Sequence, residues 1–394
     1  MAITQKIRDF MEKGSFIRKM FEEGDILKAK HGKENVFDFS LGNPNLDPPE
    51  EVHRRLIQIL SEPVPALHGY MSNAGYLETR RAVADFLSGE HGLSFTEQEV
   101  IMTCGAAGAL NAVLKALMEP GEELIVLAPY FVEYLFYVDN AQGVPRVVPT
   151  GPNFSLDVKA IEQALTPRTK AVLINSPNNP TGKVYDETSI RQLGDLLHRY
   201  EREQGRVIYL ISDEPYRKIV YDQIQVPSIF QACRQSISVT SYSKDLSLPG
   251  ERIGYLAIHP QIPDKEELLA ACTFTNRILG FVNAPALMQR LLPAVQGLTV
   301  DIGLYQKKRD IFYKGLTQIG YQLTKPEGAF YLFPQSPIPD DVAFIQALQE
   351  ELILAVPGMG FGAPGYFRIA YCAPDATIEK SLPGFERAFK KFAN

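Results

Sequence analysis

The sequence predicts an α/β protein in which a mostly parallel sheet is covered by helices, followed by a smaller α+β domain. Three observations support this prediction. Short, nearly continuous apolar runs recur between residues 123 and 243, as parallel strands buried on both faces require. Segments with helical periodicity separate these runs. After about residue 290 the alternation stops, and a long charged helix precedes two short strands and a terminal helix.

The elements follow one another in a regular order. The first 36 residues have a charged, helical pattern, and the proline-rich stretch VFDFSLGNPNLDPP closes any regular element after them. Amphipathic periodicity then predicts helices, and apolar runs predict strands. The predicted helices are 75–87, 107–118, 187–201, 301–320 and one at the C-terminal end, and the predicted strands are 123–129, 171–177, 207–216, 236–243, 328–334 and 366–372.

The composition indicates a cytoplasmic protein that acts on small molecules. The chain has 394 residues, enough for two domains, with 45% hydrophobic and 22% charged residues. A net charge of −6 argues against a nucleic-acid surface. The N-terminal residues lack the apolar core of a secretory signal, and no segment approaches the roughly 18 apolar residues of a membrane span. Four scattered cysteines without a CxxC pair indicate reduced thiols.

Polar side chains gather at the ends of three successive predicted strands. In a doubly wound sheet, the carboxyl ends of the strands are where ligands bind. Turn formation explains any one of these clusters equally well, because Asn, Pro, Gly and Asp favour turns. The three clusters together predict one site, which collects Asn178, Asn179, Asp213, Glu214, Tyr216, Ser241, Ser243 and Lys244.

The chemistry that best uses this set is that of pyridoxal phosphate. Lys244 supplies an amine that bonds to the cofactor aldehyde, and Asp213 keeps the pyridine nitrogen protonated, which makes the ring an electron sink. A lone lysine is usually an exposed loop residue, but the flanking serines and the spacing from Asp213 favour a catalytic role. We expect Arg252, Ser241 and Ser243 to contact the phosphate of the cofactor. We expect Tyr216 and Asn179 to donate hydrogen bonds to the phenolic oxygen of its ring.

These motifs resemble those of a known family. The segment SYSKDLSLPGERIGY (241–255) resembles the lysine signature of the class I/II aminotransferases, in the aspartate aminotransferase superfamily. NSPNNPTG, DEPY and YFRIA also resemble motifs of that family, in the same order and at similar separations. The resemblance runs from about residue 36 to the end. It implies PLP fold type I with a seven-stranded, mostly parallel sheet, a large domain of residues 49–288, and a small domain of residues 1–48 and 289–394.

The resemblance also implies how the cofactor is held. Gly105, Ala106 and Ala107 of TCGAAGAL would offer backbone N–H groups to the phosphate at a helix N-terminus. On the residues alone, close helix packing explains this stretch equally well. Phe131 matches the aromatic residue that stacks on the pyridine ring. Tyr70 resembles a tyrosine that reaches the phosphate in the partner subunit, which implies a homodimer with a shared active site.

For the substrate, the resemblance implies that Arg368 binds the α-carboxylate. A planar guanidinium fork suits a carboxylate better than an ammonium group does. Gly42, through its backbone, and Asn179 are expected beside the same carboxylate.

Departures from the family pattern bear on the substrate. Aspartate-specific members commonly place Trp at the stacking position, and this chain has no Trp. One aspartate-using branch has a Lys where Ala107 stands here. Another branch has an Arg at the position that Ile278 occupies here. Arg277 lies beside that position and is a candidate for the same role, but a surface or dimer-contact role for Arg277 is an equally good interpretation. We therefore expect a broader range of amino acids than aspartate alone.

Two other kinds of site find no support in the sequence. GFGAPG (360–365) fits a dinucleotide pattern, but the segment after it reads as a strand rather than a phosphate-capping helix. The six histidines have no ligand or triad spacing, so we expect neither a metal site nor a Ser-His-Asp site.

The expected function is therefore transfer of the amino group of an L-amino acid to a 2-oxo acid, either 2-oxoglutarate or pyruvate, by a ping-pong mechanism. Lys244 would act as the general base, with Asp213 and Tyr216 as the other catalytic residues. Two alternatives remain open: a pyridoxal-phosphate-dependent C–S β-lyase of the same fold, and a non-catalytic regulatory protein that binds the cofactor.

Overall fold

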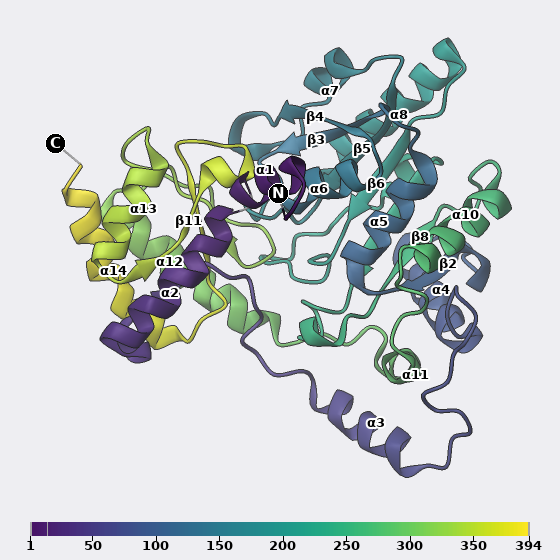
Figure 1. Cartoon of the computed structure of the whole chain (residues 1–394), viewed down its shortest axis with the longest axis horizontal. Helices are drawn as coiled ribbons and strands as arrows, with labels where there is room; N and C mark the ends of the chain where they lie inside the picture. The colour runs from purple at the N-terminus through teal and green to yellow at the C-terminus, as the bar shows by residue number, and fades with distance from the viewer. Residues whose placement is uncertain (1, 14, 393–394) are drawn as a thin grey trace.

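A seven-stranded sheet forms the centre of the protein, whose computed structural model describes residues 2–13 and 15–392 (Figure 1). All neighbouring strands are parallel except at one strand, β8, which runs antiparallel to both of its neighbours. This confirms the predicted α/β class and its mostly parallel sheet. The spatial order is β2 (Val100–Thr103), β8 (Gly254–Ile258), β7 (Ser236–Ser241), β6 (Tyr209–Asp213), β5 (Thr169–Asn175), β3 (Glu123–Ala128) and β4 (Val144–Pro149).

Helices bury both faces of this sheet, which explains the continuous apolar strands. Along β3, Leu124 and Val126 pack into one apolar cluster, while Ile125 and Leu127 pack into another on the opposite face. The first cluster includes α5 (Gly105–Leu117), α6 (Glu133–Asn140) and α10 (Lys265–Ile278). The second includes α3 (Glu50–Ser61), α4 (Leu77–His91), α7 (Val158–Ala164), α8 (Glu187–Gln204), α9 (Ile229–Ala232) and α11 (Ala286–Val295).

Local sequence signals fix the ends of the long helix α8. The side chain of Asp186 accepts a hydrogen bond from the backbone N–H of Ser189, which caps the first turn. Gly205 ends the helix with φ at 64°, a left-handed conformation that glycine adopts without strain. The helix predicted over residues 187–201 is therefore confirmed, and its true end lies three residues further on.

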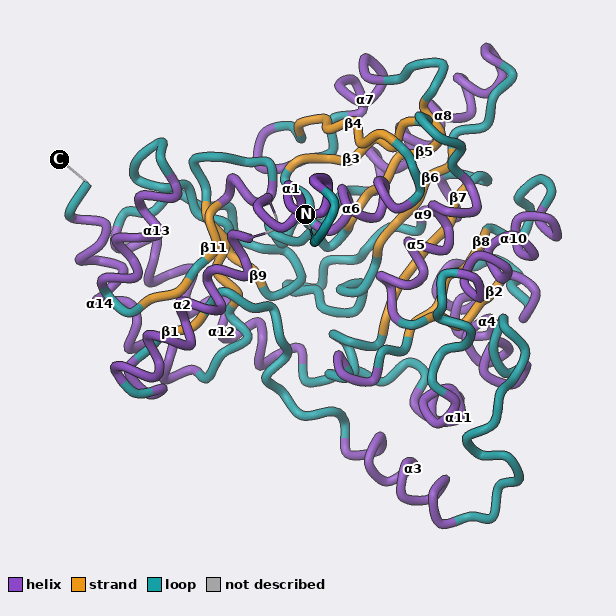
Figure 2. Tube along the Cα trace, in the orientation of Figure 1, coloured by secondary structure: helices purple, strands orange, loops and turns teal. Residues whose placement is uncertain are grey.

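A second group of elements surrounds a separate apolar cluster (Figure 2). β1 (Phe37–Asp38) pairs with β10 (Ile353–Leu354), and β12 (Phe367–Ala370) lies between β9 (Tyr331–Leu332) and β11 (Val356–Pro357). The helices here are α2 (Ser15–His31), α12 (Ile302–Ile319), α13 (Asp341–Glu350) and α14 (Asp375–Lys390). We propose that the two groups correspond to a large domain, 49–288, and a small domain, 1–48 with 289–394, although α11, which crosses residue 288, packs with the sheet.

The N-terminal helix α1 (Gln5–Lys13) lies against the sheet-bearing part of the chain, beside α6 (Figure 1). The rings of Phe10 and Phe136 are 5.0 Å apart, and Lys6 pairs with Asp139 at 2.6 Å. None of the helices in the described part of the chain is long and apolar enough to cross a membrane.

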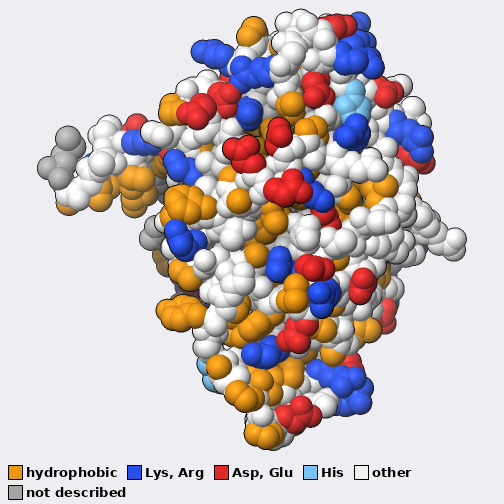
Figure 3. Space-filling view, turned by 90° about the vertical axis from the view of Figure 1, so that its right-hand side faces the viewer, with side chains coloured by type: hydrophobic (Ala, Val, Ile, Leu, Met, Phe, Trp, Pro, Cys, Tyr) orange, Lys and Arg blue, Asp and Glu red, His pale blue; other side chains and the backbone are white. Residues whose placement is uncertain are grey.

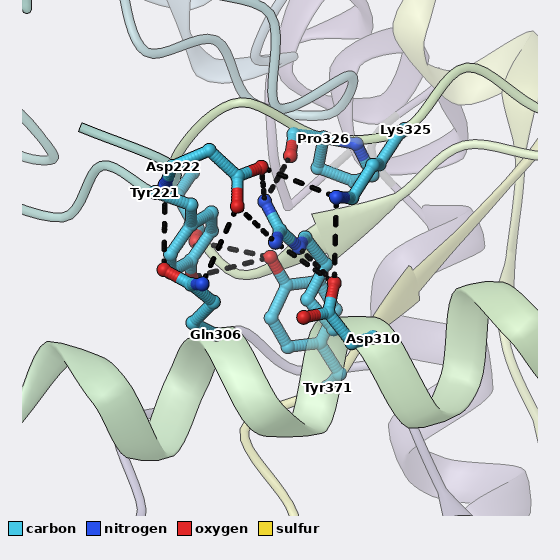
Figure 4. A network of polar contacts seen from close by, with 9 residues as sticks. Tyr221, Asp222, Gln306, Asp310, Lys325, Pro326 and Tyr371 are labelled. Atoms are coloured by element: carbon cyan, nitrogen blue, oxygen red, sulfur yellow. Dashed lines mark hydrogen bonds and ion pairs between the residues drawn. The ribbon is translucent and has the colours of Figure 1, made fainter. Parts of the chain in front are cut away.

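A network of polar contacts joins the loop that follows β6 to helix α12 (Figure 4). The side chain of Arg309 is fully buried, and its guanidinium donates to both carboxylate oxygens of Asp222 at 2.9 and 3.1 Å. It also donates to the backbone oxygen of Pro326 and lies over the ring of Tyr221. The network therefore ties the loop after β6 to helix α12.

Replacing Arg309 with leucine is expected to lower the free energy of unfolding by about 3 kcal/mol, because several charge-assisted hydrogen bonds are lost. Urea unfolding measures the change. Lys307→Leu is the matched control, because Lys307 is 62% exposed and pairs with Asp375 at the surface. It should leave the unfolding midpoint nearly unchanged. Equal midpoints for the two variants would show that the network adds no stability.

Candidate active site

A cavity of about 310 Å³ opens at the carboxyl ends of the central strands. β5, β6 and β7 are adjacent and parallel, so Asn175, Asp213 and Ser241 end side by side. The cavity brings together most of the residues that the sequence singled out: Gly42, Ala106, Ala107, Phe131, Asn179, Asp213, Tyr216, Ser241, Ser243, Lys244, Arg252 and Arg368.

Lys244 lies in the turn after β7 and reaches into this cavity. Its Nζ donates a hydrogen bond to the backbone oxygen of Gly42 at 2.8 Å. Burial lowers the pKa of Lys244 to about 8, and repulsion from Arg368 and Arg252 acts in the same direction. At pH 7 about a tenth of the amine is then neutral, far more than for a solvated lysine, and the neutral form is what a nucleophile or a general base requires.

This lowered pKa leads to a kinetic prediction. Only the neutral amine attacks an aldehyde, so capture of pyridoxal phosphate by cofactor-free protein should accelerate with rising pH, with a midpoint near the pKa of about 8. Stopped-flow absorbance measures the rate, and N-acetyl-lysine methyl ester serves as the solvated control. A midpoint above about 10, where free lysine titrates, would show that the buried environment does not tune Lys244.

Asp213 ends β6 with one carboxylate oxygen already bonded and one free. Its Oδ2 accepts a hydrogen bond from the hydroxyl of Tyr134 at 2.6 Å, whereas Oδ1 is buried and has no partner among the described residues. Burial raises the pKa of Asp213 to about 7, and the hydrogen bond from Tyr134 opposes the rise. A buried, unpartnered carboxylate oxygen on the cavity wall fits a cationic N–H group, such as a protonated pyridine nitrogen.

Arg252 and the start of α5 lie next to each other at one end of the cavity. The Nη1 of Arg252 donates to the backbone oxygen of Pro249 at 2.8 Å, and no ion pair joins this guanidinium to a carboxylate among the described residues. Gly105 opens α5 with φ at 71°, and a Cβ there would lie 3.1 Å from Nη2 of Arg252. Backbone N–H groups at a helix start beside an unpaired guanidinium suit a phosphate.

The two glycines that flank Arg252 have different surroundings. A Cβ on Gly254 would lie 2.3 Å from the backbone oxygen of Thr240 and 2.9 Å from the backbone of Gly105, whereas a Cβ on Gly250 would meet nothing within 4 Å. Position 254, where β8 passes the start of α5, therefore has no room for a side chain, whereas position 250 does.

Gly254→Ala is expected to lower the free energy of unfolding by about 1–3 kcal/mol, because the backbone around Arg252 must move apart. It should also weaken retention of the cofactor. Gly250→Ala is the matched control and should change either property little. Thermal unfolding and cofactor content after dialysis measure both effects. If the two variants had the same unfolding temperature and the same cofactor content, the close approach of β8 and α5 would be contradicted.

Arg368 is a buried guanidinium without a counter-ion among the described residues. Its Nη1 donates to Oδ1 of Asn179 at 3.1 Å and its Nη2 to the backbone oxygen of Ser40 at 2.6 Å, while Nε has no partner. It lies between the rings of Tyr331 and Phe361, at 4.9 and 4.8 Å. Burial lowers the pKa of Arg368. A buried cation with a free N–H fits a ligand carboxylate.

Gly42 leaves room for a tyrosine that sequence reasoning missed. A Cβ on Gly42 would overlap the hydroxyl of Tyr331 at 2.0 Å. That hydroxyl is hydrogen-bonded to the hydroxyl of Tyr216 at 2.7 Å. Tyr331 therefore links Tyr216 to Arg368, and its only sequence signal was its place in the short strand predicted over residues 328–334.

Other lining residues were also missed. Asn175 donates from Nδ2 to the backbone oxygen of Asp213 and accepts at Oδ1 from the backbone N–H of Asn179. Tyr134 holds Asp213 as described above, from helix α6. Little in the sequence indicated either residue. Asn175 was read only as the end of a predicted strand, and Tyr134 follows Phe131 in a stretch without a recognisable pattern. Glu133 and Tyr137 on α6 complete this wall of the cavity.

Some residues from the sequence prediction do not line the cavity. Asn178 caps its own turn through Thr181, and Glu214 accepts from Ser238 on the far side of the strand ends. Tyr70 is 93% exposed. Arg277 is exposed on α10 and lies 5.2 Å from the ring of Phe274. Within one chain, neither Tyr70 nor Arg277 lines the cavity.

Comparison with known proteins identifies the family. The model of the family "Aminotransferase class I and II" matches residues 34–382. The chain is 35% identical to a probable aspartate/prephenate aminotransferase of Thermus aquaticus, over 92% of this chain and 94% of that protein. It is 28% identical to aromatic-amino-acid aminotransferase 2 of Thermococcus litoralis, over 99% of both chains.

Solved structures agree with the sequence comparison. The crystal structure of an aminotransferase from Eubacterium rectale matches all of both chains with a TM-score of 0.96 and 43% identity. The aspartate aminotransferase of Thermus thermophilus with maleate matches with a TM-score of 0.85 and 29% identity, over 95% of this chain and 96% of that one. The fold is consistent with PLP fold type I. The protein therefore belongs to the class I and II aminotransferases and is a transaminase.

Proposed function

We propose that this transaminase uses pyridoxal phosphate to move the amino group of an L-amino acid to a 2-oxo acid, 2-oxoglutarate or pyruvate, by a ping-pong mechanism. One observation carries the proposal: a buried amine with a lowered pKa, Lys244, shares a cavity with a buried guanidinium that lacks a counter-ion, Arg368. An amino acid offers the carboxylate that Arg368 lacks and an α-carbon that can then face Lys244.

The residues of the cavity fit the cofactor at each of its polar groups. Arg252 and the N–H groups at 105–107 would hold the phosphate, together with Ser241 and Ser243, and Lys244 would hold the aldehyde carbon. The free Oδ1 of Asp213 would take the ring N–H, and Phe131 would cover the ring. When bound, pyridoxal phosphate supplies an electron sink for the bonds of the substrate α-carbon.

The side chains of the protein then perform the binding and proton-transfer steps. Arg368 and Asn179 hold the substrate α-carboxylate, which fixes the α-carbon beside Lys244. The neutral Nζ of Lys244 removes the α-proton, and its lowered pKa allows this near neutral pH. Tyr216, whose hydroxyl is bonded to that of Tyr331, would donate a hydrogen bond to the phenolic oxygen of the cofactor ring. Asp213 would keep the nitrogen of the ring protonated through its free Oδ1.

We further propose a cytoplasmic homodimer with a shared active site. Tyr70 and the apolar side chains of α3 are exposed, with Ile57 at 66% and Leu60 at 56%. Hydrophobic side chains gather toward the lower end of the face shown in Figure 3. An exposed apolar surface of this kind suits contact with a second copy. All four cysteines are free thiols, which supports a reducing compartment.

The test is a panel of L-amino acids, each assayed with 2-oxoglutarate and with pyruvate, in which the new amino acid is quantified. Transfer should require both substrates, and double-reciprocal plots should be parallel, as a ping-pong mechanism requires. Pyruvate and ammonia released from a cysteine conjugate without any 2-oxo acid would instead indicate the C–S β-lyase. Cofactor binding without turnover of any donor would indicate the regulatory alternative.

A further inference from the structure

Two buried tyrosine hydroxyls meet in the wall of the active-site cavity. Tyr216 follows β6, Tyr331 belongs to β9, and both side chains are buried and line the cavity. Their hydroxyl oxygens are 2.7 Å apart, and neither hydroxyl has another hydrogen-bond partner among the described residues. The function proposed above gives a role to Tyr216 but none to Tyr331.

Packing holds the two hydroxyls together. The rings of Tyr216 and Tyr331 meet edge to face, with centroids 5.7 Å apart and an interplanar angle of 82°. The ring of Phe330 packs against Tyr216 at 5.3 Å in the same manner. The hydroxyl of Tyr331 also fills the space beside Gly42, where a Cβ would lie 2.0 Å from it. This hydroxyl is therefore held between Gly42 and Tyr216.

The number of hydrogens available decides the direction of this hydrogen bond. Burial raises the pKa of Tyr216 well above its usual value and that of Tyr331 to about 12, so both phenols keep their protons near neutral pH. Each hydroxyl has one hydrogen to donate and can accept from others. If Tyr216 gives its hydrogen to the phenolic oxygen of the cofactor, the hydrogen between the two tyrosines must come from Tyr331.

The surroundings of Tyr331 favour the same direction. The guanidinium of Arg368 lies over the ring of Tyr331, 4.9 Å from its centre. Burial raises the pKa of Tyr331, and the positive charge of Arg368 opposes this rise. A nearby cation draws electron density from the phenol and makes its hydroxyl a stronger hydrogen-bond donor.

We propose that Tyr331 is a positioning residue: its hydroxyl donates to that of Tyr216 and thereby directs the hydrogen of Tyr216 to the phenolic oxygen of the cofactor ring. The proposal rests on the proposed function, from which it takes the place of the ring beside Tyr216. A hydroxyl that accepts a hydrogen bond donates a stronger one. The bond from Tyr216 holds negative charge on the phenolic oxygen, which favours loss of the proton from the neighbouring nitrogen that Lys244 contributes.

The test is a pH titration of the absorbance of the bound cofactor, without substrate, which reports the proton on that nitrogen. In Tyr331→Phe the midpoint should rise by about 0.5 pH unit, because the bond from Tyr216 weakens. Tyr216→Phe should raise the midpoint further, since it removes that bond altogether. A midpoint in Tyr331→Phe that equals the wild-type value would overturn the proposal.

The double variant shows whether Tyr331 acts through Tyr216. In a Tyr216→Phe background the hydroxyl of Tyr331 has no acceptor to act on, so Tyr331→Phe should move the midpoint by less than about 0.1 unit. An equal shift in both backgrounds would show that Tyr331 acts on the cofactor by another route, which contradicts the proposal. Tyr331→Met, compared in the same way, replaces Tyr331→Phe if that variant folds poorly.

Tyr371→Phe is the matched control. Tyr371 is also buried, and its hydroxyl is bonded to that of Tyr221 at 3.3 Å, in the network of Figure 4 and outside the cavity. Its loss should leave the midpoint of the absorbance change at the wild-type value. If Tyr371→Phe shifted the midpoint as much as Tyr331→Phe does, loss of any buried hydroxyl would explain the effect and the proposal would be wrong.

Turnover separates failure of this inference from failure of the proposed function. If amino transfer occurs while Tyr331→Phe leaves the midpoint unchanged, the proposed function stands and the role of Tyr331 is refuted. If no donor reacts but the cofactor binds and the midpoints of the four proteins follow the expected pattern, amino transfer is refuted and the role of Tyr331 stands. A chain that takes up no cofactor would contradict both.

Discussion

Replacing Lys244 with alanine is expected to lower kcat for amino transfer by at least about 1,000-fold, because the variant loses both the nucleophilic amine and the general base. Lys244→Arg should be equally inactive, since a guanidinium keeps the positive charge but does not lose its proton at accessible pH. Initial rates with a saturating donor and acceptor measure the loss, after both variants are shown to unfold at the wild-type temperature.

Lys183→Ala is the matched control for Lys244. Lys183 is 20% exposed, pairs with Glu327 at 2.7 Å, and lies outside the cavity. Its loss should leave kcat within a few-fold of wild type. A Lys244→Ala enzyme that retains more than a tenth of wild-type turnover would show that another group removes the α-proton.

Replacing Arg368 with alanine should lower kcat/KM by about 1,000-fold, because the substrate loses a charge-assisted fork and the cavity keeps no other cation for its α-carboxylate. Cofactor content should stay at the wild-type level, since Lys244 and Arg252 are untouched. Arg368→Lys should recover only part of the loss, because an ammonium group keeps the charge without the planar fork.

Arg387→Ala serves as the control, because Arg387 is 61% exposed and pairs with Glu351 at the surface. Steady-state kinetics with several donors separate kcat from KM. If kcat/KM falls less than tenfold in Arg368→Ala, the α-carboxylate binds elsewhere. If cofactor is lost as well, Arg368 supports the fold of the cavity rather than the substrate.

Short local motifs were enough to predict the core of the site. Lys244, Asp213 and Arg252 lie next to strands whose apolar character is visible in the sequence, and the ends of adjacent parallel strands must meet. The sequence predicted the central strands for the same reason, because burial on both faces leaves a continuous apolar run. The resemblance of YFRIA to a family motif added Arg368, which the structure then brought to the same cavity.

Residues that depend on contacts between distant segments were not predictable. Tyr331 reaches Tyr216 from 115 residues away, and the space that it occupies exists only because Gly42 has no side chain. The edge strand β4 contains two prolines and an arginine, so it lacks the apolar run that marked the central strands.

The most direct test of the account is to locate the cofactor on the chain. The holoenzyme is reduced with borohydride, digested and mapped by mass spectrometry, with Lys244→Ala treated in parallel. The account predicts one pyridoxyl group per chain, on the peptide that contains Lys244, and none in the variant. A pyridoxyl group on another lysine of the wild-type protein, or no modification at all, would contradict the central role of Lys244.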